Sequence, residues 1–466
     1  MLTNVRYTVI SNLFSFLISA AVSFLVPKNL NIEAYGYLQL YIFYTGYIGF
    51  LHFGWADGLY LRYGGKYYED LDKHLFSGQF WAYTILECII GTFVFAIGGM
   101  LLIPDEKGTV VMLTGVSIVL LLPRTFLQYV LQGTNRIREY AILSIIDKGI
   151  YIIGVLLSLV IRSDNYVLII YSDLAGKLFG LLYAAFQCRN IVLARPKEIW
   201  NTIIEARTNI SVGIKLMFAN ISSMLIIGLV RVSIEQRWDV ETFGKVSLTM
   251  SVSNLLMVFI RAVALVMFPM LRRTDESKLS GIYSKMRTCL MIPLLGMLVF
   301  YYPAKVILSA WLPQYADSLI YMALLFPMCV FESKMSMLIE TYMKTLRKEK
   351  WLLMVNLTTV GLSVACTGIT VYWLHNLDLA VVSIVVLLAF RCVLAETLLS
   401  RAIEIDVKKD IACELALTAI FITASWFIGG VAGLAVYLAA YVAYLFIKRK
   451  SIADMAVMVK SKIIHS

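Results

Sequence analysis

Long apolar stretches alternate with short polar segments from one end of the chain to the other. Most of these stretches run for about 20 residues, the length that an α-helix needs to cross the hydrocarbon core of a bilayer. Charged residues, glycine or proline lie at the ends of the stretches. The pattern predicts fourteen membrane-spanning helices, with approximate bounds 7–26, 36–60, 75–102, 109–131, 140–161, 166–187, 210–230, 243–270, 289–308, 317–342, 351–374, 379–400, 411–428 and 431–447.

The composition agrees with this pattern. Of 466 residues, 60% are hydrophobic and only 15% are charged, whereas a soluble chain carries about 25% charged residues. We therefore expect an all-α integral membrane protein. The first apolar stretch continues to Pro27 without a convincing cleavage pattern, so it is interpreted as a retained helix rather than a signal peptide.

The basic residues give an orientation for these helices. Connections on the side of the N-terminus hold 27 Lys and Arg residues, and those on the opposite side hold six. By the positive-inside rule, both termini are expected to be cytoplasmic. The formal net charge of +11 then reflects orientation, and no nucleic-acid partner is expected.

The two halves of the sequence share short matches at a nearly constant separation of 208–211 residues. The matched pairs are Tyr35-Gly36 with Phe243-Gly244, Leu61-Arg62 with Leu271-Arg272, and Thr134-Asn135-Arg136 with Thr345-Leu346-Arg347. An even number of helices between copies implies two six-helix lobes related by a pseudo-two-fold axis along the membrane normal. The expected organisation is a lobe over 1–187, a cytoplasmic linker over 188–209, a second lobe over 210–400, and two further helices with a basic tail over 401–466. Transporters built from such repeats work by alternating access at a cleft between the lobes.

Some basic residues fall inside the predicted helices. Each costs about 2.5–3.5 kcal/mol at the helix centre on insertion scales. Lys177 can pair with Asp173 on its own helix face, but Arg124, Lys215, Arg261 and Arg391 have no acid three or four residues away. Arg261 and Arg391 lie about 13 Å from the cytoplasmic end of their helices, at 1.5 Å per residue. These four cations predict an anion-binding cleft, although Arg124 and Lys215 are shallow enough to snorkel instead.

The distribution of acids supports an anionic cargo. The predicted first helix of each lobe, 7–26 and 210–230, contains no Asp or Glu, whereas an exporter of organic cations needs carboxylates in its cleft. The acids deep enough to take part in ion coupling are Glu87, Asp147, Asp173, Glu332 and Glu396. The seven cysteines are scattered singly, so neither a metal site nor a cofactor is predicted.

Several short motifs resemble the polysaccharide-unit (O-antigen type) flippases of the multidrug/oligosaccharidyl-lipid/polysaccharide exporter superfamily. They are Ala34-Tyr35-Gly36-Tyr37, Phe53-Gly54-Trp55-Ala56-Asp57-Gly58, Leu61-Arg62-Tyr63, Leu131-Gln132-Gly133-Thr134-Asn135-Arg136 and Phe268-Pro269-Met270-Leu271-Arg272. The resemblance implies transfer of an undecaprenyl-diphosphate-linked oligosaccharide to the outer leaflet, driven by an ion gradient. It also implies a cationic cavity for the diphosphate, and partners in membrane lipids and the polysaccharide polymerase machinery.

Three alternatives stay open at this point. Two are transporters of the same superfamily, namely a multidrug cation antiporter and a flippase for lipid-linked peptidoglycan precursors. The third is a membrane polysaccharide polymerase or glycosyltransferase. The sequence has no long outer loop, nucleotide-binding loop or HExxH motif, so an enzyme is not expected.

Overall fold

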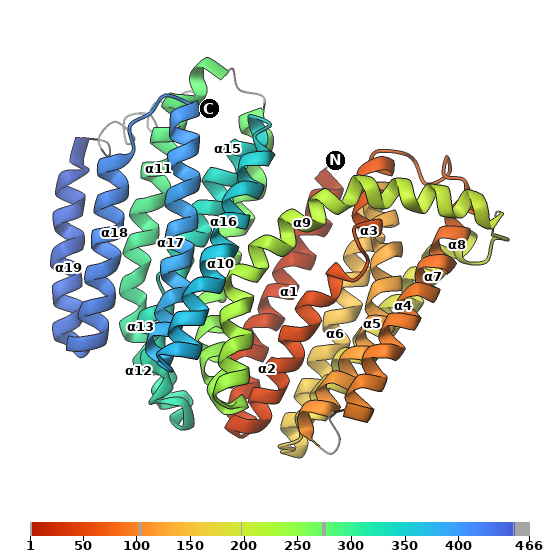
Figure 1. The fold of residues 1–466 in the computed structure, drawn as a ribbon, viewed down its shortest axis with the longest axis horizontal. Helices are drawn as coiled ribbons and strands as arrows, with labels where there is room; N and C mark the ends of the chain where they lie inside the picture. The colour runs from red at the N-terminus through yellow and green to blue at the C-terminus, as the bar shows by residue number, and fades with distance from the viewer. Residues whose placement is uncertain (1, 102–104, 197, 273–275, 451, 453–466) are drawn as a thin grey trace. The chain divides into compact units, whose positions relative to one another are not determined.

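The computed structural model describes the backbone of residues 2–101, 105–196, 198–272, 276–450 and 452, and the side chains of these residues except 2–10, 101, 256 and 258–278. All regular elements in these ranges are helical. The chain forms two compact units, which we call the N-terminal unit (1–221 with 240–244) and the C-terminal unit (222–239 with 245–466). Figure 1 shows the helices of both units as ribbons coloured along the chain.

The N-terminal unit contains the helices up to the first part of α9. They are α1 (Leu2–Asn29), α2 (Ile32–Tyr47), α3 (Trp55–Tyr63), α4 (Lys73–Leu101), α5 (Glu106–Gly133), α6 (Ile137–Ile161), α7 (Tyr166–Gln187), α8 (Arg189–Val192) and the start of α9 (Ile199–Arg237). A core between α3, α4 and α5 includes Trp55, Tyr83 and Phe126, all of which are buried.

The C-terminal unit contains the remaining helices. They are the end of α9, α10 (Val240–Arg272) from Lys245 onward, α11 (Glu276–Met297), α12 (Tyr301–Trp311), α13 (Tyr321–Leu325), α14 (Met328–Lys334), α15 (Glu340–Thr345), α16 (Glu349–Thr367), α17 (Leu377–Ala402), α18 (Lys408–Thr423) and α19 (Gly430–Ile447). In the stretch Ser318–Thr345, which includes α13–α15, 89% of an apolar 18-residue window is buried within the protein, the highest share among the described spans. Side chains on this stretch therefore meet other helices rather than lipid.

Twelve described helical stretches are long and apolar enough to cross a membrane. The other two predicted spans are 36–60, which the structure divides into shorter helices, and 243–270, which falls within the continuous helix α10. Part of α10 lies outside the described side chains. The total of fourteen spans therefore stays a prediction.

The predicted single helix over 36–60 is interrupted. A short turn follows α2, and Phe53 and Gly54 then adopt left-handed conformations with φ of 51° and 79°. Glycine tolerates this conformation without steric cost. Gly54 also lies against α9, since a Cβ on it would be 2.5 Å from the backbone nitrogen of Ile214. The chain breaks where the backbones of α3 and α9 approach too closely for side chains.

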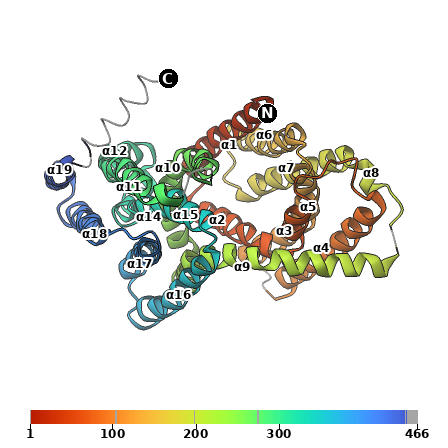
Figure 2. The ribbon, with the colours of Figure 1, turned by 90° about the horizontal axis from the view of Figure 1, so that it is seen from above.

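The segment expected to be a linker, 188–209, contains α8 and the beginning of α9. The division between the two units falls within α9 rather than in this segment. The first part of α9 crosses the end of the N-terminal unit where α3 ends and α4 begins (Figures 1 and 2). Four apolar residues of this part are exposed, namely Ile199, Trp200, Ile203 and Ile204. An exposed apolar face beside polar contacts to the protein is typical of a helix that lies in the membrane interface.

Replacing Gly58 tests the packing of α3 against α9. A Cβ at this position would lie 1.8 Å from the carbonyl oxygen of Asn209, so Gly58→Ala should destabilise the protein by about 1–3 kcal/mol through overpacking. Gly46→Ala in α2 is the matched control, because nothing lies within 4 Å of its Cβ position. The measurement is the Tm in detergent; equal Tm values for the two variants would contradict the close approach.

Candidate functional site

Two of the predicted functional residues in the N-terminal unit pair with each other. Arg124 on α5 donates from Nη1 to Oδ2 of Asp147 on α6 over 2.5 Å, and both side chains are largely buried. Gly180 on α7 lies beside Arg124, where an added Cβ would be 3.2 Å from Cδ. The predicted substrate-binding cation and the predicted coupling acid thus neutralise each other between α5, α6 and α7.

The predicted pairing of Asp173 with Lys177 on α7 is confirmed, and it extends to α2. Lys177 forms an ion pair with Asp173, and the Tyr41 hydroxyl donates to Asp173 Oδ2 over 2.7 Å. Lys177 also donates to the Tyr41 oxygen over 3.1 Å. Asp173 therefore accepts from a cation and a hydroxyl in the same place.

Arg391 on α17 lies among carboxylates rather than free in the expected anion-binding cleft. Its side chain is only 2% exposed, and Nη1 and Nη2 lie 3.1 Å and 3.2 Å from carboxylate oxygens of Glu332 and Glu340. Its Nε donates to the Asn356 side chain over 2.9 Å. None of these partners is on α17, so spacing along one helix gave no sign of them.

The remaining two predicted cations are Lys215 and Arg261. Lys215 on α9 is exposed, and no described acid lies within ion-pair distance of it. Arg261 belongs to α10, but its side chain lies outside the described residues, and its role stays a prediction.

The C-terminal unit contains a buried charge network that was not predicted from the sequence. Arg287 on α11 lies 2.8 Å from Glu396 on α17 and 2.7 Å from Glu414 on α18. Lys334 on α14 pairs with the same two glutamates, and these four side chains are at most 3% exposed. At the edge of the network, Asp410 contacts both Arg287 and Lys448, the residue that follows α19. Two buried cations face two buried anions, so the centre is neutral.

Two members of this network were missed for different reasons. Arg287 was assigned to a cytoplasmic loop because the predicted span began at residue 289, whereas α11 begins at Glu276. Glu414 lies only three residues inside the predicted span 411–428, so its position alone did not place it among the deep acids.

Glu87 on α4 differs from the other predicted coupling acids. It is fully buried, and neither carboxylate oxygen has a hydrogen-bond partner among the described residues. A second buried acid, Asp57 in the first turn of α3, lies 3.9 Å from Nε2 of His52. The other buried acids of the described chain, Asp147, Glu396 and Glu414, contact lysine or arginine.

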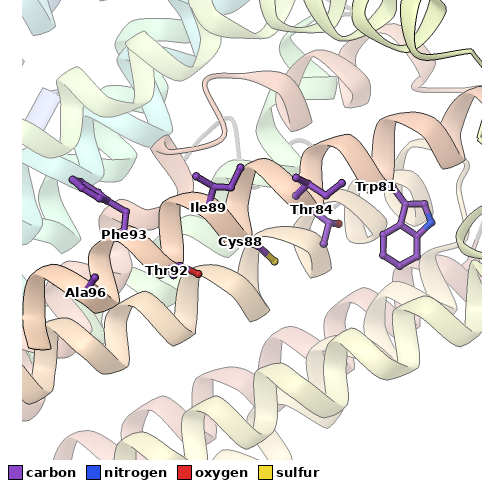
Figure 3. A pocket seen from close by; sticks show the side chains of 8 residues that line it. Trp81, Thr84, Cys88, Ile89, Thr92, Phe93 and Ala96 are labelled. Carbon is purple, nitrogen blue, oxygen red and sulfur yellow. The ribbon is translucent and has the colours of Figure 1, made fainter.

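One face of α4 forms an apolar groove of about 630 Å³ (Figure 3). Its lining residues recur at spacings of three and four, and are Trp81, Thr84, Ile85, Cys88, Ile89, Thr92, Phe93 and Ala96. None is charged, which suits a lipid chain better than an ion. No cluster of His, Cys, Asp and Glu that could hold a metal ion occurs in the described part of the chain.

The fold is shared with solved membrane transporters. The lipid II flippase MurJ in an inward closed conformation matches with a TM-score of 0.60 and 13% identity over 97% of this chain and 100% of that chain. A multidrug resistance MATE family transporter of the MOP superfamily matches in its inward-facing conformation with a TM-score of 0.59 and 15% identity, over 87% and 96% of the two chains. In an outward-facing conformation such a transporter gives 0.53 and 14% over 89% and 94%.

No protein-family model and no curated protein sequence matches the chain. At these identities the structural matches establish the fold alone. The chain is a multi-pass membrane protein with the fold of the MOP superfamily transporters.

Removing Lys334 tests the buried network. Lys334→Ala should destabilise the C-terminal unit by about 3–5 kcal/mol, because Glu396 and Glu414 would keep their charges with one cation fewer. Lys344→Ala is the control, since Lys344 is 48% exposed in its pair with Glu340 and should cost at most about 1 kcal/mol. Thermal unfolding in detergent measures both. Similar small losses would show that the network is hydrated rather than buried.

Proposed function

We propose that the protein is a flippase that moves an undecaprenyl-diphosphate-linked oligosaccharide, the repeat unit of an O-antigen or other surface polysaccharide, from the inner to the outer leaflet. It would do so by alternating access in the bacterial inner membrane, with both termini in the cytoplasm and the polysaccharide polymerase machinery using its product. The MOP-type fold supports transport. The state of the charged residues supports an anionic cargo.

The observation that carries the proposal is the pairing of five acids within the helices. Asp147, Asp173, Glu332, Glu396 and Glu414 each contact a basic side chain of the protein. An organic cation would therefore find these five carboxylates already neutralised. Lys215, by contrast, is exposed without a described acidic partner, and can hold a phosphate.

Lys215 and Arg261 are the proposed first contacts of the diphosphate. Arginine suits this role because its planar guanidinium group donates two parallel hydrogen bonds to phosphate oxygens. Arg124 and Arg391 are proposed to join by exchanging carboxylates for phosphate. Asp147 or Glu332, once released, would need a cation from solution to stay neutral, and this exchange links anion binding to ion uptake.

A flippase for lipid-linked peptidoglycan precursors is the second candidate. The match to the lipid II flippase MurJ spans all of that chain, and a lipid with a charged head group would meet the same lysine and arginine side chains. The multidrug cation antiporter is a weaker candidate, because the MATE match supports its fold but the paired acids oppose its cargo.

Lipid-linked intermediates in cells with and without the gene test the function. We expect deletion to abolish the surface polysaccharide and to leave complete lipid-diphosphate-linked repeat units in the inner leaflet. Arrest of peptidoglycan synthesis would favour the second candidate. Unchanged polysaccharide with altered resistance to cationic dyes would contradict an anionic cargo, and repeat units stranded in the outer leaflet would indicate a polymerase.

Substitution of the proposed diphosphate contacts tests the site. Arg261→Ala and Lys215→Ala should each lower polysaccharide export at least tenfold at unchanged protein level, since a lost charge-assisted hydrogen bond of about 1.5–3 kcal/mol corresponds to a factor of ten or more. Arg401→Ala is the control, because Arg401 is exposed at the end of α17. Full export by either variant would remove that residue from the site.

A further inference from the structure

The break between α2 and α3 places two titratable side chains together. His52 and Asp57 are 5% and 8% exposed, and Nε2 of His52 lies 3.9 Å from Oδ2 of Asp57. The backbone N–H of Gly54 donates to Nδ1 of His52 over 3.0 Å. In the neutral ring Nδ1 is thus the acceptor, so the single ring proton belongs on Nε2, the nitrogen near Asp57.

A polar row on α4 continues from this break. Gln79, Tyr83 and Glu87 recur at a spacing of four and share one helix face. All three are fully buried. Gln79 accepts from the indole N–H of Trp55, the first residue of α3, over 3.2 Å. The row therefore begins beside α3 and extends along α4 to Glu87.

Tyr83 links the row on α4 to the start of α3. Its ring packs edge-on against Trp55, with centroids 5.5 Å apart, and Glu87 lies one helical turn further along the same face of α4. The Tyr83 hydroxyl, like both oxygens of Glu87, has no hydrogen-bond partner in the described part of the chain. Each group has free capacity to donate or accept a proton.

Polar side chains of α5, α3 and α9 also lie around this row. The Tyr129 hydroxyl on α5 lies 3.5 Å from Asp57 Oδ1. Arg62, further along α3, is 2.6 Å from Glu205 of α9, and Asn209 of α9 donates to Gln79 over 2.6 Å. Neither Asp57 nor Glu87 has lysine or arginine within ion-pair distance among the described side chains.

This lack of a permanent cation separates the two acids from Asp147, Asp173 and Glu396. An ionised carboxylate is costly to bury alone, and ionisable groups within the membrane mark proton relays in pumps and transporters. A carboxyl group that no lysine or arginine neutralises keeps its capacity to gain and lose a proton. A coordinated sodium ion would need several oxygen ligands together, whereas here the acids are spread along a row with a histidine at one end.

We propose that Asp57, Tyr83 and Glu87 form the path of the coupling proton in the N-terminal unit, with the Nε2–H of His52 facing the Asp57 carboxylate. When the Tyr83 hydroxyl comes within hydrogen-bond distance of both acids, Glu87 gives its proton to the Tyr83 oxygen while the Tyr83 hydroxyl gives its own to the ionised Asp57. Glu87 ends as a carboxylate and Asp57 as a carboxylic acid. The direction reverses when a proton enters at Asp57. Proton binding needs no assumption about cargo; only its coupling to flipping rests on the proposed function.

Infrared difference spectroscopy of the full-length protein in lipid nanodiscs, stepped in pH, tests proton binding directly. We expect a buried carboxylic-acid C=O band that is lost in Glu87→Gln. In Asp57→Asn this band should titrate at a shifted pH, because the two acids share one path. Glu349→Gln, an exposed acid at the start of α16, should leave it unchanged.

Tyr83→Phe tests the path without removing a charge. Because the Tyr83 hydroxyl has no hydrogen-bond partner among the described residues, this variant should keep the native Tm. It should lower at least tenfold the rate at which an imposed pH gradient decays through proteoliposomes that contain the pH dye pyranine. Phe126→Leu, at a residue whose ring packs 5.4 Å from Tyr83, serves as the control and should retain the native rate of decay.

The outcomes distinguish failure of the proton path from failure of the proposed flippase function. A Glu87 band that ignores Asp57→Asn, or native proton flux in Tyr83→Phe, would overturn the proton path. A C=O band that responds to sodium rather than pH would overturn it in favour of a sodium site. Normal proton behaviour in a protein whose deletion leaves surface polysaccharide intact would instead keep the path and reject the proposed flippase.

Discussion

Charge inside the membrane must be neutralised, and much of this structure follows from that requirement. Carboxylates from neighbouring helices contact each of the buried cations Arg124, Arg391, Arg287 and Lys334. Loss of one partner leaves a buried charge at a cost of several kcal/mol. The same contacts that neutralise charge therefore also fix which helices lie side by side, and α18 is joined to α11 and α14 in this way.

Side chains outside these pairs have functional significance for the same reason. Lys215 is exposed and is the proposed contact of an anion. Glu87 and Asp57 lack a lysine or arginine partner among the described residues and are the proposed sites of proton binding and release. A transporter needs both properties, since the cargo must be held reversibly and the driving ion must change its binding state during the cycle. In this account the fixed ion pairs stabilise the helix packing, and the side chains without such a partner bind the cargo and the protons.

The sequence predicted features that depend on one helix at a time. Apolar length identified the membrane class, and a spacing of four identified the pair of Asp173 and Lys177. The partners of Arg124 and Arg391 were not predictable, because Asp147 is 23 residues away and Glu332 is 59 residues away on other helices. The break at Phe53-Gly54 was hidden because glycine is frequent in membrane helices that continue through it. Close approach of α9 to Gly54 and Gly58 is a tertiary feature.

Reconstitution into liposomes measures the central claim, transport of an anionic lipid carrier, most directly. The lipid-diphosphate-linked oligosaccharide is incorporated into both leaflets, and a hydrolase added outside cleaves the units that it can reach. The account predicts that cleavage passes from the outer-leaflet fraction to nearly the whole pool when the protein is present and a pH gradient is imposed. If cleavage stops at the outer-leaflet fraction while the same vesicles accumulate a cationic dye, the protein transports cations and the account is wrong.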